Sequence, residues 1–196
     1  MKFYESGDNR KPVIFLFPGT CCLYSSFDHV LDGLHSYFYT VTVSYDGFDP
    51  NEKTEFYSME DECEKIEQEI RKKYGGRIYL VAKIQSSMVV PFMYKMVHTG
   101  TLPKFMQKKL DKTDGGKKEL YNGFLNMFGI GKGGSPWITK QSIYNQFYSD
   151  LVTKVQHGID VPGTTIHVFY ATKMGEKYEK RYCTYFKNPD IRKHNM

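Results

Sequence analysis

Long apolar runs are missing from this sequence of 196 residues. No stretch approaches the roughly 18 to 20 apolar residues of a membrane span, so we expect no transmembrane helix. The amino-terminal segment, MKFYESGD, also lacks the apolar stretch of about 7 to 15 residues that a secretory signal needs. Together these absences predict a protein that folds and works in the cytoplasm.

Cysteine is scarce, and histidine does not occur in metal-binding patterns. The four cysteines include no Cys-x-x-Cys pair, and the adjacent Cys21 and Cys22 are poorly placed to bridge each other. We therefore expect reduced thiols. The six histidines show neither a His-Glu-x-x-His motif nor zinc-site spacing with cysteine. The sequence predicts no metal and no cofactor.

Charge of one sign is not in strong excess. The net charge of +5 is modest for this length, and no nucleic-acid-binding motif is present, so we expect no nucleic acid as partner. Several lysines crowd residues 104–118, which is typical of a solvated helix face. An alternative interpretation makes this basic stretch an interaction module for an acidic partner, a nucleic acid or a membrane surface.

The sequence does contain enough apolar residues for a folded core. A hydrophobic fraction of 40% and an aromatic fraction of 16% exclude a disordered chain, and the length fits one domain over residues 1–196. Apolar or β-branched runs predict strands at residues 12–17, 38–45, 77–82, 164–171 and 191–196. Helical periodicity predicts helices at residues 26–37, 59–74 and 176–186. Strands that alternate with helices indicate an α/β fold with a mostly parallel sheet and flanking helices.

The helix after Ser58 carries the clearest start signal. Ser58-Met59-Glu60-Asp61 resembles a capping box with Asp in place of Glu. Its first half is acidic and its last turn is basic, which suits the helix dipole at both ends. The apolar stripe that we expect to face the core consists of Met59, Cys63, Ile66 and Ile70.

Residues 83–153 contain little strand-like sequence and much helical periodicity, so they predict a helical insertion. Its methionines either fill irregular core space or line an adaptable apolar groove. The glycine-rich residues 129–136 lack the Gly-Lys-[Ser/Thr] ending of a phosphate loop and predict a flexible loop. Beyond this loop, Thr139 is expected to cap a helix that carries Ile143, Phe147, Leu151 and Val152.

Three short segments resemble the α/β-hydrolase family. Phe17-Pro18-Gly19-Thr20 matches the loop after the first central strand of that family. Tyr45-Asp46-Gly47-Phe48 resembles the turn after the next strand, and Thr172 to Glu176 resembles the place of the triad acid. Residues 11–82 and 160–196 then look like the two flanks of the family's sheet, and residues 83–153 look like its helical lid.

This resemblance implies an activity and a site. The family members it points to hydrolyse carboxylic esters or thioesters, so a small-molecule ester or acyl substrate is expected. The loop with Gly19, Thr20 and Cys21 corresponds to the one that gives a backbone N–H to the oxyanion hole. Glu176 would be the acid that orients the catalytic histidine.

The nucleophile elbow of the family is missing. The strand that ends at Ala82 runs into Lys83-Ile84-Gln85-Ser86-Ser87-Met88 in place of Gly-x-Ser-x-Gly. An elbow serine needs small neighbours, because it sits on a strained strand-to-helix turn, and neither Ser86 nor Ser87 has them. The simplest account is that an elbow, a helix and a strand are absent between Ala82 and Lys83. The resemblance also implies that the family's histidine segment is cut short, which leaves His194 as the candidate base.

Two functional hypotheses follow. In the first, the chain is an esterase-like serine hydrolase with Ser86 as nucleophile, His194 as base and Glu176 as acid, impaired or inactive because the elbow is absent. In the second, it is a non-catalytic module that binds a ligand or partner under its helical segment. Each residue also has a structural interpretation: helix-start hydroxyls, a strand-surface histidine and a helix N-terminal carboxylate. Cys21 and Cys22 are interpreted as small buried thiols in preference to nucleophiles.

Overall fold

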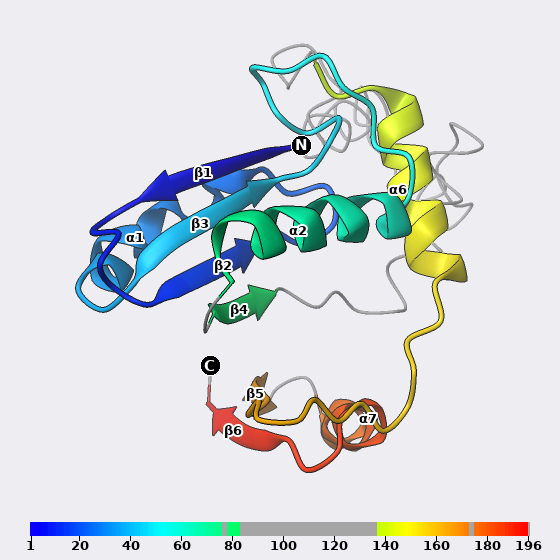
Figure 1. Cartoon of the computed structure of the whole chain (residues 1–196). Helices are drawn as coiled ribbons and strands as arrows, with labels where there is room; N and C mark the ends of the chain where they lie inside the picture. Colours follow the sequence, from blue (N-terminus) through cyan, green and yellow to red (C-terminus); the bar gives the residue numbers. More distant parts are fainter. Residues whose placement is uncertain (76–77, 83–136, 173–174, 196) are drawn as a thin grey trace, which may run out of the picture. The chain divides into compact units, whose positions relative to one another are not determined.

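The computed structural model describes residues 1–75, 78–82, 137–172 and 175–195 (Figure 1). These residues form two compact units, residues 1–152 and residues 153–196. Nothing in the structure tests the prediction of a single domain over the whole chain. Most of the predicted helical insertion, including the basic residues 104–118, lies outside the described residues.

The first unit is built on a four-stranded sheet with the order β1-β3-β2-β4. Its strands are β1 (Lys2–Ser6), β2 (Val13–Phe17), β3 (Tyr39–Ser44) and β4 (Ile78–Ala82). Strand β2 pairs in parallel with both β3 and β4, as the alternating sequence predicted. Strand β1 was not predicted, and it pairs antiparallel with β3, so the sheet is mixed but mostly parallel.

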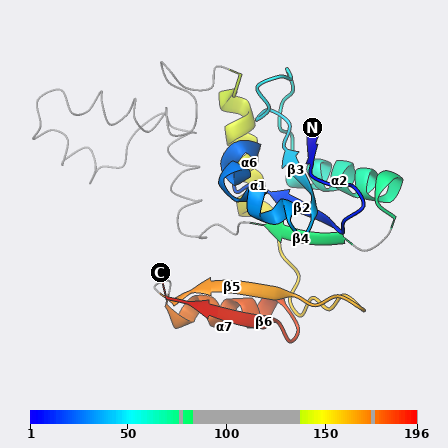
Figure 2. The same cartoon turned by 90° about the vertical axis from the view of Figure 1, so that its left-hand side faces the viewer.

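Strand β2 separates two apolar cores. Phe15, fully buried, belongs to the core on one face, which also receives Ile66 and Ile70 from α2 (Met59–Lys73). Its neighbours Ile14 and Leu16 point to the other face, where α1 (Asp28–His35) and the 3-10 helix η1 (Tyr24–Phe27) pack. Helices α1 and α2 therefore cover opposite faces of the sheet (Figure 2).

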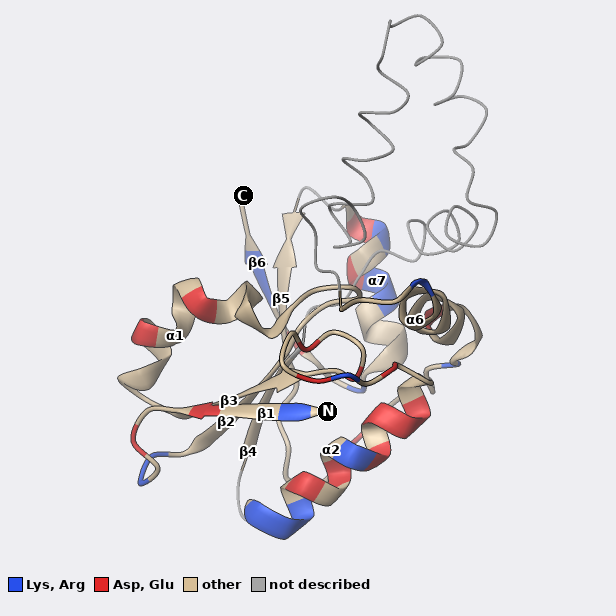
Figure 3. Cartoon of the chain, turned by 90° about the horizontal axis from the view of Figure 1, so that it is seen from above, with Lys and Arg blue, Asp and Glu red and all other residues tan. Residues whose placement is uncertain are grey.

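Helix α2 begins as predicted, and three of the four residues of the expected apolar stripe pack against the core. The Ser58 hydroxyl accepts a hydrogen bond from the Asp61 N–H at 3.2 Å, and the acidic start and basic end of the helix are visible in Figure 3. Cys63, which was assigned to the buried stripe, is exposed. The fully buried position is Glu62. A hydrogen bond from the Asp46 N–H offsets part of the cost of burying this carboxyl, which apolar patterning does not anticipate.

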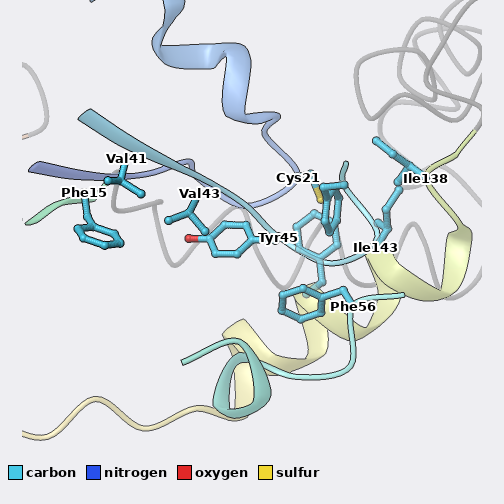
Figure 4. Close-up of a cluster of buried hydrophobic side chains, with 10 residues drawn as sticks. Phe15, Cys21, Val41, Val43, Tyr45, Phe56, Ile138 and Ile143 are labelled. Carbon is cyan, nitrogen blue, oxygen red and sulfur yellow. The ribbon is translucent and has the colours of Figure 1, made fainter. Parts of the chain in front are cut away.

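Helix α6 (Lys140–Val152) closes the first core. Thr139 caps it as predicted, because its side-chain oxygen accepts a hydrogen bond from the Ser142 N–H at 3.0 Å. Ile143 and Phe147 are buried in the same cluster as Phe15 and Cys21 (Figure 4), and Trp137 packs against it. Leu151 and Val152 are exposed. The described end of the lid-like segment is thus part of the core.

Strand β4 differs from the buried strand that the apolar sequence of residues 77–82 predicted. It pairs with β2 along one edge, but Tyr79, Leu80 and Val81 are 50%, 61% and 41% exposed. The apolar composition of a strand indicates that its side chains are suited to burial. It does not show that other elements pack over them. Among the described residues, no strand pairs with the second edge of β4.

The second unit is a small α/β arrangement. Strands β5 (His167–Ala171) and β6 (Asp190–His194) pair in parallel, joined by α7 (Glu176–Tyr185). Val168, Tyr170 and Tyr182 form its core. The sequence predicted all three elements. No helix among the described residues is long and apolar enough to cross a membrane.

The turn after β3 requires glycine at one position. Gly47 has φ +77°, and a Cβ there would lie 2.3 Å from the Ser142 hydroxyl oxygen and 2.9 Å from the Phe56 backbone nitrogen. We expect Gly47→Ala to lower the free energy of unfolding by about 2 kcal/mol or more, through left-handed strain and overpacking. Gly33 in α1 has open space around it, so Gly33→Ala should raise stability by about 0.5–1 kcal/mol. Urea unfolding measures both, and equal effects of the two variants would contradict this account of the turn.

Candidate functional site

The site is built at the edge where the parallel strands end. Strands β2 and β3 run in the same direction, so the turn after Phe17 and the turn after Ser44 emerge side by side. Strand β4 ends at the same edge with Ala82. In open α/β sheets, ligands bind at the carboxyl ends of the strands, and the predicted oxyanion-hole loop lies there.

The turn after β2 has a defined and strained shape. The Cys22 N–H donates a hydrogen bond to the Gly19 carbonyl oxygen at 2.9 Å, which closes a turn over Thr20 and Cys21. Cys21 has φ +56°, in the left-handed region that non-glycine residues rarely adopt. Backbone strain of this kind costs about 1–3 kcal/mol and is held only where surrounding contacts fix it. Nothing in the sequence predicted this conformation, since glycine is the usual residue at such a position.

Two side chains of α6 hold this turn. The Cys21 N–H donates to the Gln146 side-chain oxygen at 2.6 Å, and the Thr20 hydroxyl donates to the Asp150 carboxylate at 2.6 Å. Gln146 is 1% exposed. Burial raises the pKa of Asp150, and the hydrogen bond from Thr20 opposes that rise. Sequence reasoning missed both residues, although their separation of four places them on one face of a helix.

The thiol of Cys21 is unsuited to nucleophilic chemistry. Cys21 is buried in the same apolar cluster as Ile143 (Figure 4). Burial raises the pKa of this thiol well above its usual value, and the nearby Asp150 carboxylate adds to the rise. Because the thiolate is the reactive form, this environment favours a packing role, as the sequence analysis preferred.

Beside the second turn lies a buried cluster of charges. Glu62 accepts a hydrogen bond from the Asp46 N–H at 3.2 Å, and the Lys65 ammonium lies 2.5 Å from Asp46 and 3.4 Å from Glu62. Lys65 also pairs with Asp61, and the Met1 ammonium pairs with Asp46. Oxygens of Asp46, Asp61 and Glu62 lie within 4.8 Å of one another. The ammonium groups of Lys65 and Met1 offset part of the negative charge of these three carboxyls.

Glu62 and Asp46, two of the three carboxyls of this cluster, respond differently to their surroundings. Burial raises the pKa of Glu62 to about 7, despite the hydrogen bond from the Asp46 N–H. Burial would also raise the pKa of Asp46, but the hydrogen bonds from Lys65 and the Met1 ammonium outweigh it and hold that pKa below its usual value. Glu62 is therefore the group of this cluster that changes charge near neutral pH.

Comparison with solved structures identifies the architecture. An α/β-hydrolase family protein from Desulfitobacterium hafniense superposes with a TM-score of 0.60 over 99% of this chain and 90% of its own, at 10% identity. An esterase from a marine microorganism gives 0.56 over 100% and 90%, at 13% identity. The chain has the α/β-hydrolase fold. This fold also matches 1H-3-hydroxy-4-oxoquinoline 2,4-dioxygenase, with a TM-score of 0.59 over 99% and 86% at 13% identity, so architecture alone does not choose the reaction.

No family model matches the sequence, and no curated protein sequence matches it.

The structure describes only some of the predicted triad residues. Ser86 and Ser87 lie outside the described residues. Glu176 is the exposed first residue of α7, and His194 is the exposed last residue of β6, where its ring stacks on Phe169 at 5.9 Å. Both lie beyond or at the carboxyl ends of parallel strands of the second unit, the edge where the fold places its acid and base. No hydrogen bond or ion pair is found between these two described residues, and their catalytic roles remain predictions.

In each unit, a histidine also makes hydrogen bonds where the parallel strands begin. The Ser6 hydroxyl is 2.9 Å from His35 Nε2, and both also contact the Thr40 hydroxyl. His167 Nδ1 lies 2.7 Å from the Asp190 carboxylate. Each group joins strand ends where the parallel strands begin, away from the edge at which α/β sheets bind ligands. We interpret both groups as hydrogen bonds that stabilise the fold.

The raised pKa of Glu62 predicts a pH-dependent stability. Its folded pKa of about 7 exceeds the unfolded value of 4.5, so its contribution to stability is greatest below pH 4.5 and is lost as pH rises through 7. Glu62→Gln keeps an acceptor for the Asp46 N–H but cannot ionise. We expect this variant to gain stability relative to the original protein between pH 5 and pH 8, by about 1.4 kcal/mol per pKa unit.

Denaturant unfolding at the two pH values measures this gain. Glu64→Gln, at an exposed position of the same helix, is the matched control and should show no such gain. Parallel pH profiles for Glu62→Gln and the original protein would show that Glu62 ionises normally.

Proposed function

We propose that this hydrolase-fold protein binds an ester or another acyl ligand at the turn after β2, and that its hydrolysis of esters or thioesters is impaired. The observation that carries the proposal is the fixed, left-handed turn at Cys21, whose buried N–H is presented at the carboxyl edge of the sheet. A donor held in this way matches the oxygen of an acyl group.

The physical basis is electrostatic preorganisation. A donor fixed by the fold does not reorganise when a carbonyl oxygen arrives, and in a site that excludes water its hydrogen bond is stronger than in water. The Cys21 N–H satisfies both conditions, since the turn is closed by its own hydrogen bond and Cys21 is 9% exposed. The donor is suited to a neutral carbonyl as well as to a developing oxyanion.

Impaired turnover follows from the sequence beyond β4. A serine hydroxyl needs a strained turn with small neighbours, a histidine to take its proton and an acid to orient that histidine. The segment after Ala82 contains no Gly-x-Ser-x-Gly, and Ile84 and Met88 flank Ser86. Without a competent nucleophile, an oxyanion hole and substrate binding alone retain about 10³ to 10⁴ of rate enhancement over water.

The alternative of a partner-binding module rests on the basic residues 104–118. That stretch lies outside the described residues, so the alternative remains a prediction from sequence. The geometry of the turn after β2 favours a small acyl ligand.

Covalent labelling tests the catalytic half of the proposal. We expect a fluorophosphonate probe to leave Ser86 and Ser87 of the folded protein unlabelled, because neither serine is activated. Mass spectrometry of the intact protein and of its peptides measures the labelling. The rate of p-nitrophenyl butyrate hydrolysis should be the same for Ser86→Ala as for the original protein. Stoichiometric labelling at Ser86, together with loss of hydrolysis in Ser86→Ala, would establish a working serine hydrolase.

Cysteine-selective ¹⁵N labelling tests the binding half. The chain has four cysteines, so the spectrum contains few amide signals, and Cys21→Ala identifies the signal of Cys21. Titration with methyl butyrate should shift the Cys21 signal and leave the signals of the exposed Cys63 and Cys183 in place. An unchanged Cys21 signal at saturating ester would remove the turn as the binding site.

A further inference from the structure

We propose that Gln146 is a built-in competitor for the acyl site: its side-chain oxygen occupies the Cys21 N–H until a ligand oxygen replaces it. This inference rests on the proposed binding of acyl ligands at the turn. Its geometric basis is the 2.6 Å hydrogen bond from the Cys21 N–H to the carboxamide oxygen of Gln146. A carboxamide carbonyl and an ester carbonyl present the same kind of acceptor, so Gln146 fills the place of the ligand oxygen.

Contacts other than the one with Gln146 also hold the turn. The hydrogen bond from the Cys22 N–H to the Gly19 carbonyl closes it, and the Thr20 hydroxyl anchors it to Asp150. The Tyr45 hydroxyl lies 3.4 Å from the Pro18 carbonyl oxygen and supports its first residue. None of these contacts involves the Cys21 N–H. That donor is paired with the Gln146 side-chain oxygen.

The position of Gln146 on α6 is costly for a polar side chain. Its neighbours Ile143 and Phe147 are 0% and 1% exposed and belong to the main apolar core, and Gln146 itself is 1% exposed. Burying an amide without a hydrogen bond costs about 1–3 kcal/mol in protein mutational data. The hydrogen bond to Cys21 compensates this cost in the ligand-free protein, and a ligand must break it.

Helix α6 itself is held firmly. Ile143 and Phe147 anchor it in the core, and the Asn145 side chain donates a hydrogen bond to the Phe56 carbonyl at 2.8 Å. Release of the site therefore requires the Gln146 side chain to turn away from Cys21, while the helix stays docked. The Gln146 oxygen and the ligand oxygen compete for the single Cys21 N–H. Removing the Gln146 oxygen should therefore change the binding free energy by the net value of one hydrogen bond.

A purely structural role for Gln146 makes the opposite prediction. If the glutamine only stabilises the turn, its loss weakens both the fold and ligand binding. If it competes with the ligand, its loss weakens the fold but strengthens binding. The sign of the change in affinity separates the two roles even when both variants are destabilised.

Three variants of the full chain make the test. Gln146→Met removes the acceptor at nearly constant size, and Gln146→Glu keeps an acceptor for the Cys21 N–H. Asn145→Met is the matched control, because it removes a hydrogen bond from the same helix to a loop without touching the Cys21 N–H. Each protein is labelled with ¹⁵N-cysteine and titrated with methyl butyrate, and hydrogen exchange of the Cys21 amide is recorded without ligand.

We expect Gln146→Met to exchange the Cys21 amide faster and to bind methyl butyrate about fivefold more tightly, as the loss of one net competing hydrogen bond implies. Gln146→Glu should bind no more tightly than the original protein, and Asn145→Met should bind equally well. Weaker or unchanged binding by Gln146→Met, while the original protein binds, would overturn the competition and leave the proposed binding intact. Absence of a Cys21 shift in all four proteins would overturn both proposals.

Discussion

The first unit depends on burying β2 on both of its faces. The strand lies between β3 and β4, so its backbone is paired on both edges, and its side chains alternate between two apolar cores. A strand in this position needs a helix on each side, which α1 and α2 provide. The direction of β2 then fixes where the turn with Cys21 emerges. The candidate site is a consequence of this central strand before any functional residue is considered.

Polar contacts connect α6 to the turns at that edge of the sheet. Gln146, Asp150, Ser142 and Asn145 all lie on α6, and each bonds to one of the two turns or to the loop after the second turn. Around them the core is aromatic and aliphatic. Buried polar groups demand specific partners, whereas apolar groups accept many arrangements. The apolar residues therefore drive docking of α6, and the polar ones fix its register against the turns.

Local sequence signals predicted the regular elements well. The apolar runs located β2, β3 and β4 to within a residue or two, and Ser58 and Thr139 marked the starts of α2 and α6. Strand β1 was missed because Lys2–Ser6 is short, partly charged and pairs with residues some forty positions away. Gln146 and Asp150 were missed for a related reason: a polar residue on a helix is normally solvated, and only the folded chain brings these two to a turn 125 and 130 residues earlier. Long-range polar pairing leaves no periodic trace in sequence.

The position of Trp137 makes tryptophan fluorescence a property of the first unit alone. It is the single tryptophan of the chain, it packs against the core of the first unit, and it stands two residues before the cap of α6. The second unit, residues 153–196, contains tyrosines but no tryptophan. Selective excitation of the indole therefore gives fluorescence that reports the packing of α6 and the unfolding of the first unit. The second unit contributes no tryptophan fluorescence. The two units can be distinguished in a mixed signal without adding any label.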